Sequence, residues 1–239
     1  MKQLIQLFKL IFLKEFHNST EHYAQGEIVK FYTDMIDKGL FPDELEAFRS
    51  MQENGVRSLI LIGAGTGREA KVFAENGLNV YAIEPVNSMK INAYKHPKIS
   101  YFEQLNEVNA SEDVIYITRN LLSLLNRKER EFLLSQIFMR MDSKKLLLFQ
   151  ADIMTLSWNK SFKLKFLEQV GRFFNLNRSF ESGDTYRFNL DYNAQSNIWC
   201  FYHYFPESAD LLYEVKSHCR NCKIKELSGG FFCLQLVDE

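Results

Sequence analysis

The chain has 239 residues, of which 46% are hydrophobic and 25% are charged, as in an ordinary globular protein. This composition excludes an intrinsically disordered chain, a collagen-like repeat and a small disulfide scaffold. With 29 basic and 30 acidic residues the formal net charge is -1, so no overall positive field exists to hold duplex nucleic acid.

The first 16 residues are apolar, but the pattern is not that of a signal peptide or a membrane span. Lys9 and Lys14 interrupt the apolar run, and no small-residue cleavage site follows. The helical spacing of the apolar residues predicts an amphipathic helix that packs on its own domain or joins a homo-oligomer. Binding to a membrane surface is the alternative, although such helices usually carry a more basic polar face.

Residues 27–51 continue the helical pattern, with a break at 39–42. Pro42 suits the first turn of a new helix, and the two acidic residues after it suit the positive end of the helix dipole. We expect residues 1–55 to form an N-terminal helical lid.

Short apolar runs then alternate with helical stretches. The predicted strands are 56–62, 79–83, 99–102, 113–117 and 146–149, and the predicted helices are 68–76, 87–94 and 126–141. Such alternation requires crossover connections and a parallel sheet with helices on both faces. The fold class is therefore α/β, a doubly wound, mostly parallel, Rossmann-like sheet.

The rhythm stops after Asp152, and residues 157–205 are rich in aromatic and polar side chains. Two antiparallel strands at 186–190 and 198–202 indicate a small cap, inserted after the fifth strand, over the carboxyl edge of the sheet. A helix at 206–218 and strands at 223–227 and 231–237 then return to the sheet as an antiparallel edge hairpin. The core therefore comprises 56–156 and 206–239.

The most informative segment is Gly63-Ala64-Gly65-Thr66-Gly67, between a predicted strand and a predicted helix. Glycines let the backbone turn sharply and approach a ligand, and the following helix offers free N–H groups. Glu84 ends the next strand, where a carboxylate can accept hydrogen bonds from both hydroxyls of a ribose. The combination predicts a nucleoside-cofactor site.

The spacing of the glycines narrows the choice of cofactor. The dinucleotide fingerprint requires glycine at the sixth position of the loop, and this chain has Arg68 there. A nicotinamide cofactor is thus disfavoured. A phosphate-binding loop is excluded, because no Gly-Lys-Ser/Thr ends the segment.

These residues resemble a known family. The segment 56–84, with Gly-Ala-Gly-Thr-Gly-Arg-Glu at 63–69 and Ile-Glu-Pro at 83–85, is similar to the class I S-adenosylmethionine-dependent methyltransferases. The likeness extends in strand order to about residue 152. The C-terminal helix and the two strands after it are similar to the terminal reversed hairpin of that fold.

The resemblance implies a site for S-adenosylmethionine. The residues of the loop that would pass under the methionine and ribose parts are Gly63, Ala64, Gly65 and Gly67. Glu84, with Pro85 after it, would hold the ribose, and Met89 would pack near the adenine. Tyr23 resembles the lid tyrosine that many small-molecule methyltransferases place over the cofactor.

Strand order adds further positions. Glu103 and Gln104 fall where the family contacts adenine, although they read equally well as solvated loop residues. The tripeptide Thr118, Arg119 and Asn120 falls where the methyl-bearing end of the cofactor meets the acceptor. This tripeptide is not the Asn/Asp-Pro-Pro-Tyr/Phe motif of enzymes that methylate base amino groups, so such an activity is disfavoured.

The sequence departs from the family at one position. The family commonly has an acidic residue two positions before the first glycine of the loop, and this chain has Leu61 there. The amino group of the cofactor must therefore find another partner.

Residues for the acceptor side are less distinctive. Methyl transfer from a sulfonium needs proximity and alignment, and a general base helps when the acceptor must lose a proton. Asp152, after the fifth strand, and His203, near the end of the cap, are the candidates. Alternatively, Asp152 caps a helix and His203 is a buried, hydrogen-bonded histidine.

The four cysteines, Cys200, Cys219, Cys222 and Cys233, all lie in the last forty residues. They are too few and too clustered to crosslink the fold, which indicates a reducing, cytoplasmic setting. His218 and the Cys-x-x-Cys pair suggest zinc, but no second pair stands at usable spacing. We expect packed thiols and no metal.

The sequence thus predicts a cytoplasmic methyltransferase that uses S-adenosylmethionine and acts on a small-molecule acceptor. The alternative is a protein that binds S-adenosylmethionine or S-adenosylhomocysteine as a regulatory or partner subunit, without transferase activity. We expect neither a duplex nucleic acid partner nor a membrane span.

Overall fold

The computed structural model describes residues 19–153, 184–188, 199–219, 221–227 and 230–238. The amphipathic helix expected within residues 1–16 and most of the expected cap, 157–205, lie outside these residues. Within the described part of the chain, no helix is both long enough and apolar enough to cross a membrane.

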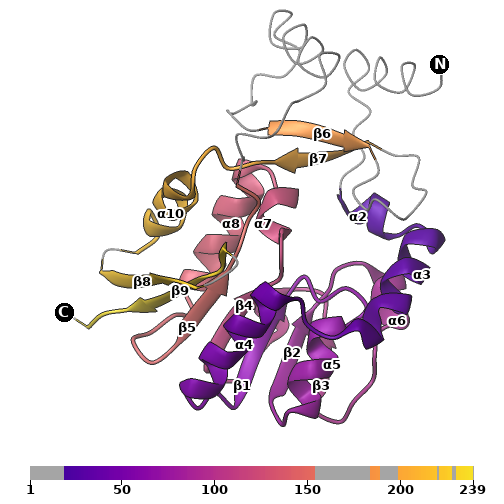
Figure 1. Ribbon diagram of the computed structural model, residues 1–239, viewed down its shortest axis with the longest axis horizontal. Coiled ribbons are helices and arrows are strands. Elements are labelled where there is room, and N and C mark those ends of the chain that lie inside the picture. The colour runs from indigo at the N-terminus through magenta and orange to yellow at the C-terminus, as the bar shows by residue number, and fades with distance from the viewer. Residues whose placement is uncertain (1–18, 154–183, 189–198, 220, 228–229, 239) are drawn as a thin grey trace, which may run out of the picture.

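A seven-stranded sheet forms the centre of the molecule, in the order β3-β2-β1-β4-β5-β9-β8 (Figure 1). Its first five strands are parallel, and β9 runs antiparallel to both β5 and β8. The strands are β1 Ser58–Ile62, β2 Asn79–Ile83, β3 Ile99–Phe102, β4 Val114–Ile117, β5 Leu146–Phe149, β8 Cys222–Glu226 and β9 Phe232–Leu236. The predicted parallel sheet with an antiparallel edge hairpin is confirmed.

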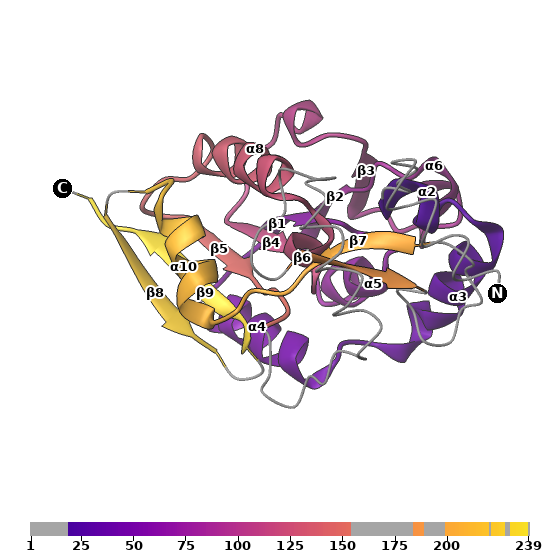
Figure 2. The same ribbon diagram turned by 90° about the horizontal axis from the view of Figure 1, so that it is seen from above.

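Helices cover both faces of this sheet (Figure 2). The helices of the described residues are α2 Ser19–Tyr23, α3 Gly26–Met35, α4 Pro42–Glu53, α5 Arg68–Glu75, α6 Asn87–Ile91, α7 Leu121–Leu124, α8 Arg127–Phe138 and α10 Ser208–Lys216, with short 3-10 turns at Ile36–Lys38 and Leu105–Glu107. Pro42 begins α4 as predicted, and the carboxylate of Glu44 accepts a hydrogen bond from the backbone N–H of Phe41 at 2.7 Å.

The alternation of side chains along each strand divides the core into two clusters. In β1, Ile60 and Ile62 pack with α8 and α10 on one face, whereas Leu59 and Leu61 pack with α4 and α5 on the other. Leu59, Ile60 and Leu61 are fully buried. Each such residue contributes about 1.5–3 kcal/mol of hydrophobic free energy, so the central strands form the stable base on which the loops rest.

Two helical elements differ from the prediction. The helix expected at 87–94 ends at Ile91, and the backbone N–H of Tyr94 donates instead to the carbonyl of Thr66 at 2.9 Å. The short helix α7 was not predicted, because four residues are too few for a helical period to show.

A separate two-stranded sheet lies beyond the carboxyl edge of the main sheet (Figure 1). Its strands are β6 Asp184–Phe188 and β7 Trp199–His203, which are antiparallel, as expected, but displaced from the predicted 186–190 and 198–202. The chain that leaves β7 is tied to the main sheet, because the N–H of Phe205 donates to the carbonyl of Asp152 at 3.0 Å.

Candidate functional site

A cavity of about 760 Å³ lies at the carboxyl edge of the sheet, between the glycine loop, α2, α3, α7 and β7. Most of the residues predicted for the site line it. These are Tyr23, Gly63, Ala64, Gly65, Glu84, Pro85, Met89, Thr118, Arg119, Asn120 and Asp152. The carboxyl ends of β1, β2, β4 and β5 bring most of these residues together, as expected for a ligand site of an open α/β sheet, and Tyr23 of α2 and Met89 of α6 complete the set.

The three glycines of the loop all have positive φ, at 83° for Gly63, 54° for Gly65 and 89° for Gly67. A β-carbon on Gly63 would lie 2.6 Å from the hydroxyl of Thr118, and one on Gly67 would overlap the hydroxyl of Tyr101. A β-carbon on Gly65 would meet no atom within 4 Å. Gly63 and Gly67 are therefore required for packing, whereas Gly65 leaves open space above the loop for a ligand.

Glu84 is held beside this loop by the backbone. One carboxylate oxygen accepts from the N–H of Gly65 at 2.7 Å, and the other accepts from the N–H of Val86 at 2.8 Å. Burial raises the pKa of Glu84, and the two backbone hydrogen bonds and Lys90 oppose this shift. Each oxygen keeps a lone pair for a further donor, so the carboxylate can accept from two neighbouring hydroxyls.

The residues after β4 form a second wall of the cavity. The hydroxyl of Thr118 donates to the carbonyl of Gly63 at 3.1 Å, which ties this segment to the glycine loop. Asn120 is the non-glycine residue of the described chain that adopts a positive φ, 62°. Its Oδ1 atom is buried and accepts no hydrogen bond from the described residues, so it is available to a donor on a ligand.

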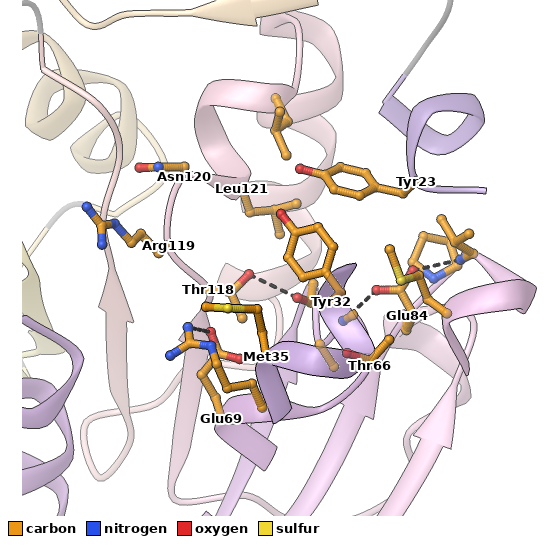
Figure 3. A pocket seen from close by; sticks show the side chains of 18 of the residues that line it. Tyr23, Tyr32, Met35, Thr66, Glu69, Glu84, Thr118, Arg119, Asn120 and Leu121 are labelled. Atoms are coloured by element: carbon orange, nitrogen blue, oxygen red, sulfur yellow. Dashed lines mark hydrogen bonds and ion pairs between the residues drawn. The ribbon is translucent and has the colours of Figure 1, made fainter. Parts of the chain in front are cut away.

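Tyrosine side chains cover the cavity. Tyr23 of α2 and Tyr32 of α3 lie above the glycine loop (Figure 3), with ring centroids 5.6 Å apart in an edge-to-face arrangement. From the other side, Tyr202 and Tyr204 pack against each other at 4.8 Å. Aromatic rings thus line the cavity from two sides.

A network of charges at the floor of the cavity was missed by the sequence analysis. The guanidinium of Arg68 forms two hydrogen bonds with Glu44, at 2.7 and 2.6 Å, and one with Glu69 at 2.8 Å. Arg68 and Glu69 line the cavity. Only a tertiary structure shows this network, because Glu44 lies 24 residues away from Arg68 and belongs to α4.

Four residues predicted for the site do not line the cavity. They are Gly67, whose place in the loop is described above, and Glu103, Gln104 and His203. His203 is 3% exposed and its ring packs edge-on against Phe205, with centroids 4.6 Å apart. Tyr202 and Tyr204 face the cavity, so His203, one residue from each, faces the opposite way. Glu103 bonds Lys90 at 2.8 Å on the surface, and Gln104 lies beside it outside the cavity. The structure gives no support to His203 as a base or to Glu103 and Gln104 as adenine contacts.

The Cys-x-x-Cys pair does not line this cavity: Cys219 follows α10, and Cys222 begins β8. The sulfurs of Cys219 and Cys222 are 3.0 Å apart, and both residues are free thiols. Burial, with the neighbouring sulfur, raises the pKa of Cys219 to about 12, so this thiol stays protonated at neutral pH. Within the described ranges, no group of three or more potential metal ligands occurs.

Solved structures to which this chain is similar include S-adenosylmethionine (SAM)-dependent methyltransferases. One from Methanosarcina mazei has a TM-score of 0.55 and 16% identity, over 84% of this chain and all of that chain. The sugar N-methyltransferase of a Streptoalloteichus species has a TM-score of 0.58 and 13% identity, over 84% of this chain and 90% of that chain. The magnesium protoporphyrin IX methyltransferase of Synechocystis, with bound S-adenosylhomocysteine (SAH), has a TM-score of 0.50 and 14% identity, over 86% and 84%.

The chain has the fold of the SAM-dependent methyltransferases. The family resemblance drawn from residues 56–84 is thereby confirmed at the level of the fold. No protein-family model and no curated protein sequence matches the chain. The choice of cofactor and acceptor therefore rests on the residues of the cavity.

Proposed function

We propose that this protein is a SAM-dependent methyltransferase that acts on a small-molecule acceptor. One observation carries the proposal: Gly65 and Glu84 line the same cavity. Gly65 has open space beside its α-carbon, and the carboxylate of Glu84 is held in place by the backbone N–H of Gly65. A nucleoside can lie close to backbone that has no side chain, while its ribose hydroxyls donate to the carboxylate.

The residues present fit this cofactor in three respects. Glu84 offers acceptors for a ribose, Met89 lines the cavity next to it, and the buried Oδ1 of Asn120 lacks the donor that a ligand can supply. When bound, SAM supplies a methyl group already activated by its sulfonium. The protein then has to align the acceptor and exclude water.

The acceptor side of the cavity contains a carboxylate and a phenol in contact. The hydroxyl of Tyr202 donates to a carboxylate oxygen of Asp152, and both residues line the cavity. The second oxygen of Asp152 can accept a hydrogen bond from a hydroxyl or amine of the methyl acceptor. This bond would orient the lone pair of the nucleophilic oxygen or nitrogen. In this proposal Asp152 also takes the proton that such an acceptor loses.

The size of the cavity and the named acceptors of its structural neighbours both support a small-molecule acceptor. A volume of about 760 Å³ is in the range of pockets that enclose small ligands. The neighbours named above include one enzyme for a sugar and one for a porphyrin. We also propose a reducing, cytoplasmic location, since Cys219, Cys222 and Cys233 are free thiols.

Two experiments test the proposal in turn. Calorimetric titration with SAM and with SAH should show binding of both, and the absence of heat and of a thermal shift with either ligand would contradict the cofactor assignment. Incubation with methyl-labelled SAM and a metabolite extract should then label a small molecule. Binding without any labelled product would favour the alternative, a regulatory or partner subunit that binds the cofactor.

A further inference from the structure

The methionine end of SAM carries an ammonium group, and the first strand of this chain offers no acidic residue for it. Leu61 occupies the position where the resemblance leads one to expect an acid. Its side chain is fully buried in the hydrophobic cluster that includes Phe73 and Tyr116. An ammonium group in this cavity therefore needs a carboxylate from another element.

The network around Arg68 contains one more carboxylate than it has cations. Arg68 is the single cation that forms ion pairs with Glu44 and Glu69 among the described residues. Glu44 is completely buried, and both of its oxygens are occupied by Arg68, one of them also by the N–H of Phe41. The unmatched negative charge therefore belongs to Glu69.

Glu69 is also the member of this network that a ligand can reach. It lines the cavity, and its side chain is 10% exposed, whereas the side chain of Glu44 is 0% exposed. Glu69 is the second residue of α5, the helix that begins at the end of the glycine loop. Figure 3 shows Glu69 and Glu84 on opposite sides of the cavity, with Thr66 of the loop next to Glu84.

The other two acidic residues that line the cavity, Glu84 and Asp152, have other contacts or lie elsewhere in it. Both oxygens of Glu84 are held by backbone N–H groups and face the ribose in the proposed function. Asp152 follows β5, which is separated from β1 by β4, and it accepts from Tyr202. Glu69 is thus the carboxylate placed to meet a ligand that extends from Glu84 across the glycine loop.

We propose that Glu69 binds the ammonium group of the cofactor and takes over the role of the acidic residue missing from β1. Arg68, held by Glu44, is a positioning residue that fixes the Glu69 carboxylate toward the cavity. This inference rests on the proposed function, because it presupposes that SAM occupies the cavity.

Two ligands that differ in the ammonium group can test for this contact. SAH has the adenosine, the thioether and the amino acid, whereas 5′-methylthioadenosine has the adenosine and thioether without the ammonium or carboxylate groups. Glu69→Gln keeps the size of the side chain and removes its charge. We expect this variant to bind SAH about tenfold or more weakly than the unaltered protein, and to bind 5′-methylthioadenosine within twofold of it.

Two further variants complete the comparison by titration calorimetry. Glu75→Gln changes a carboxylate at the other end of α5, outside the cavity lining, and should leave both affinities unchanged. Glu84→Gln should weaken both ligands by the same factor, because both contain the ribose.

Two results would overturn the inference, and a third would contradict the proposed function. An equal loss of affinity for SAH and 5′-methylthioadenosine in Glu69→Gln would show that Glu69 acts on the shape of the loop or on folding and does not contact the ammonium group. Unchanged SAH affinity would show that the ammonium group lies elsewhere. Failure of the unaltered protein to bind either ligand would instead contradict the proposed function itself.

Discussion

The hydroxyl of Tyr202 donates a hydrogen bond to the carboxylate of Asp152, and this contact joins β7 to the segment that follows β5. The backbone of Asp152 is also fixed, since its N–H donates to the hydroxyl of Ser123 and its carbonyl accepts from Phe205, each at 3.0 Å. Asp152 is thus held from three directions at the wall of the cavity.

This arrangement predicts a catalytic effect without a binding effect. Asp152→Asn removes the proton acceptor and should lower kcat by about 100-fold or more, the usual contribution of a general base. The dissociation constant for SAM should stay within twofold. Steady-state kinetics with the acceptor identified from the extract, together with calorimetry, provide the measurement. Wild-type kcat in this variant would remove Asp152 from the mechanism.

His203 should behave in the opposite way. Its ring is buried against Phe205 on the side of β7 that faces away from the cavity. His203→Ala should therefore lower the free energy of unfolding, by about 1–3 kcal/mol, and leave kcat of the folded fraction unchanged. Denaturant unfolding and kinetics at a temperature well below the transition separate the two effects. A large fall in kcat with unchanged stability would restore His203 as a base.

Two glycines of the same loop should respond differently to alanine. Both have positive φ, which costs about 1–2 kcal/mol for a residue with a β-carbon. Gly67→Ala adds an overlap with Tyr101 and should be the less stable variant. Gly65→Ala should destabilise the fold less but should weaken the binding of SAM, because the added β-carbon enters the space proposed for the ligand. Thermal unfolding and calorimetry of both variants give the comparison, and equal SAM affinities would contradict it.

Glu84 should contribute to binding through its charge. Glu84→Ala leaves the ribose hydroxyls without a charged acceptor, and SAM binding should weaken by about 1.5–3 kcal/mol. The sheet does not depend on this side chain, so circular dichroism should be unchanged. An unchanged dissociation constant in a folded variant would place the ribose elsewhere.

The stability of the protein should depend on pH through Glu69. Burial is the main cause that raises its pKa from 4.5 to about 7, with repulsion from Glu44 adding to the shift and Arg68 opposing it. The folded state therefore binds a proton that the unfolded state releases between these two values. Stability from this group is present below about pH 4.5 and is lost as the pH rises to about 7.

Glu69→Gln should remove this contribution. The difference in unfolding free energy between the variant and the unaltered protein should shift in favour of the variant from pH 5 to pH 7.5, as measured by urea denaturation. A difference that stays constant with pH would show that Glu69 is ionised throughout this range. SAH affinity of the unaltered protein should rise over the same interval, because an ionised Glu69 attracts the ammonium group.

The sheet and the glycine loop could be predicted because they depend on local patterns. β2 and β3 coincide with the predicted ranges, and Glu84 follows β2 directly, so its position was fixed once the strand was recognised. The network of Glu44, Arg68 and Glu69 could not be predicted, because it depends on how α4 packs beside α5. The orientation of His203 could not be predicted for a related reason: the phase of β7 relative to the cavity is set by the tertiary contacts of Tyr202 and Tyr204.

The position of β9 between β5 and β8 has a consequence for synthesis on the ribosome. β8 precedes β9 in the chain but pairs with the main sheet through it. Until residues 232–236 have emerged, β5 has an open hydrogen-bonding edge and β8 has no partner in the sheet, and both are exposed to pairing with other chains. Completion of the sheet therefore waits for β9, and a nascent chain that stalls before β9 carries an unprotected edge.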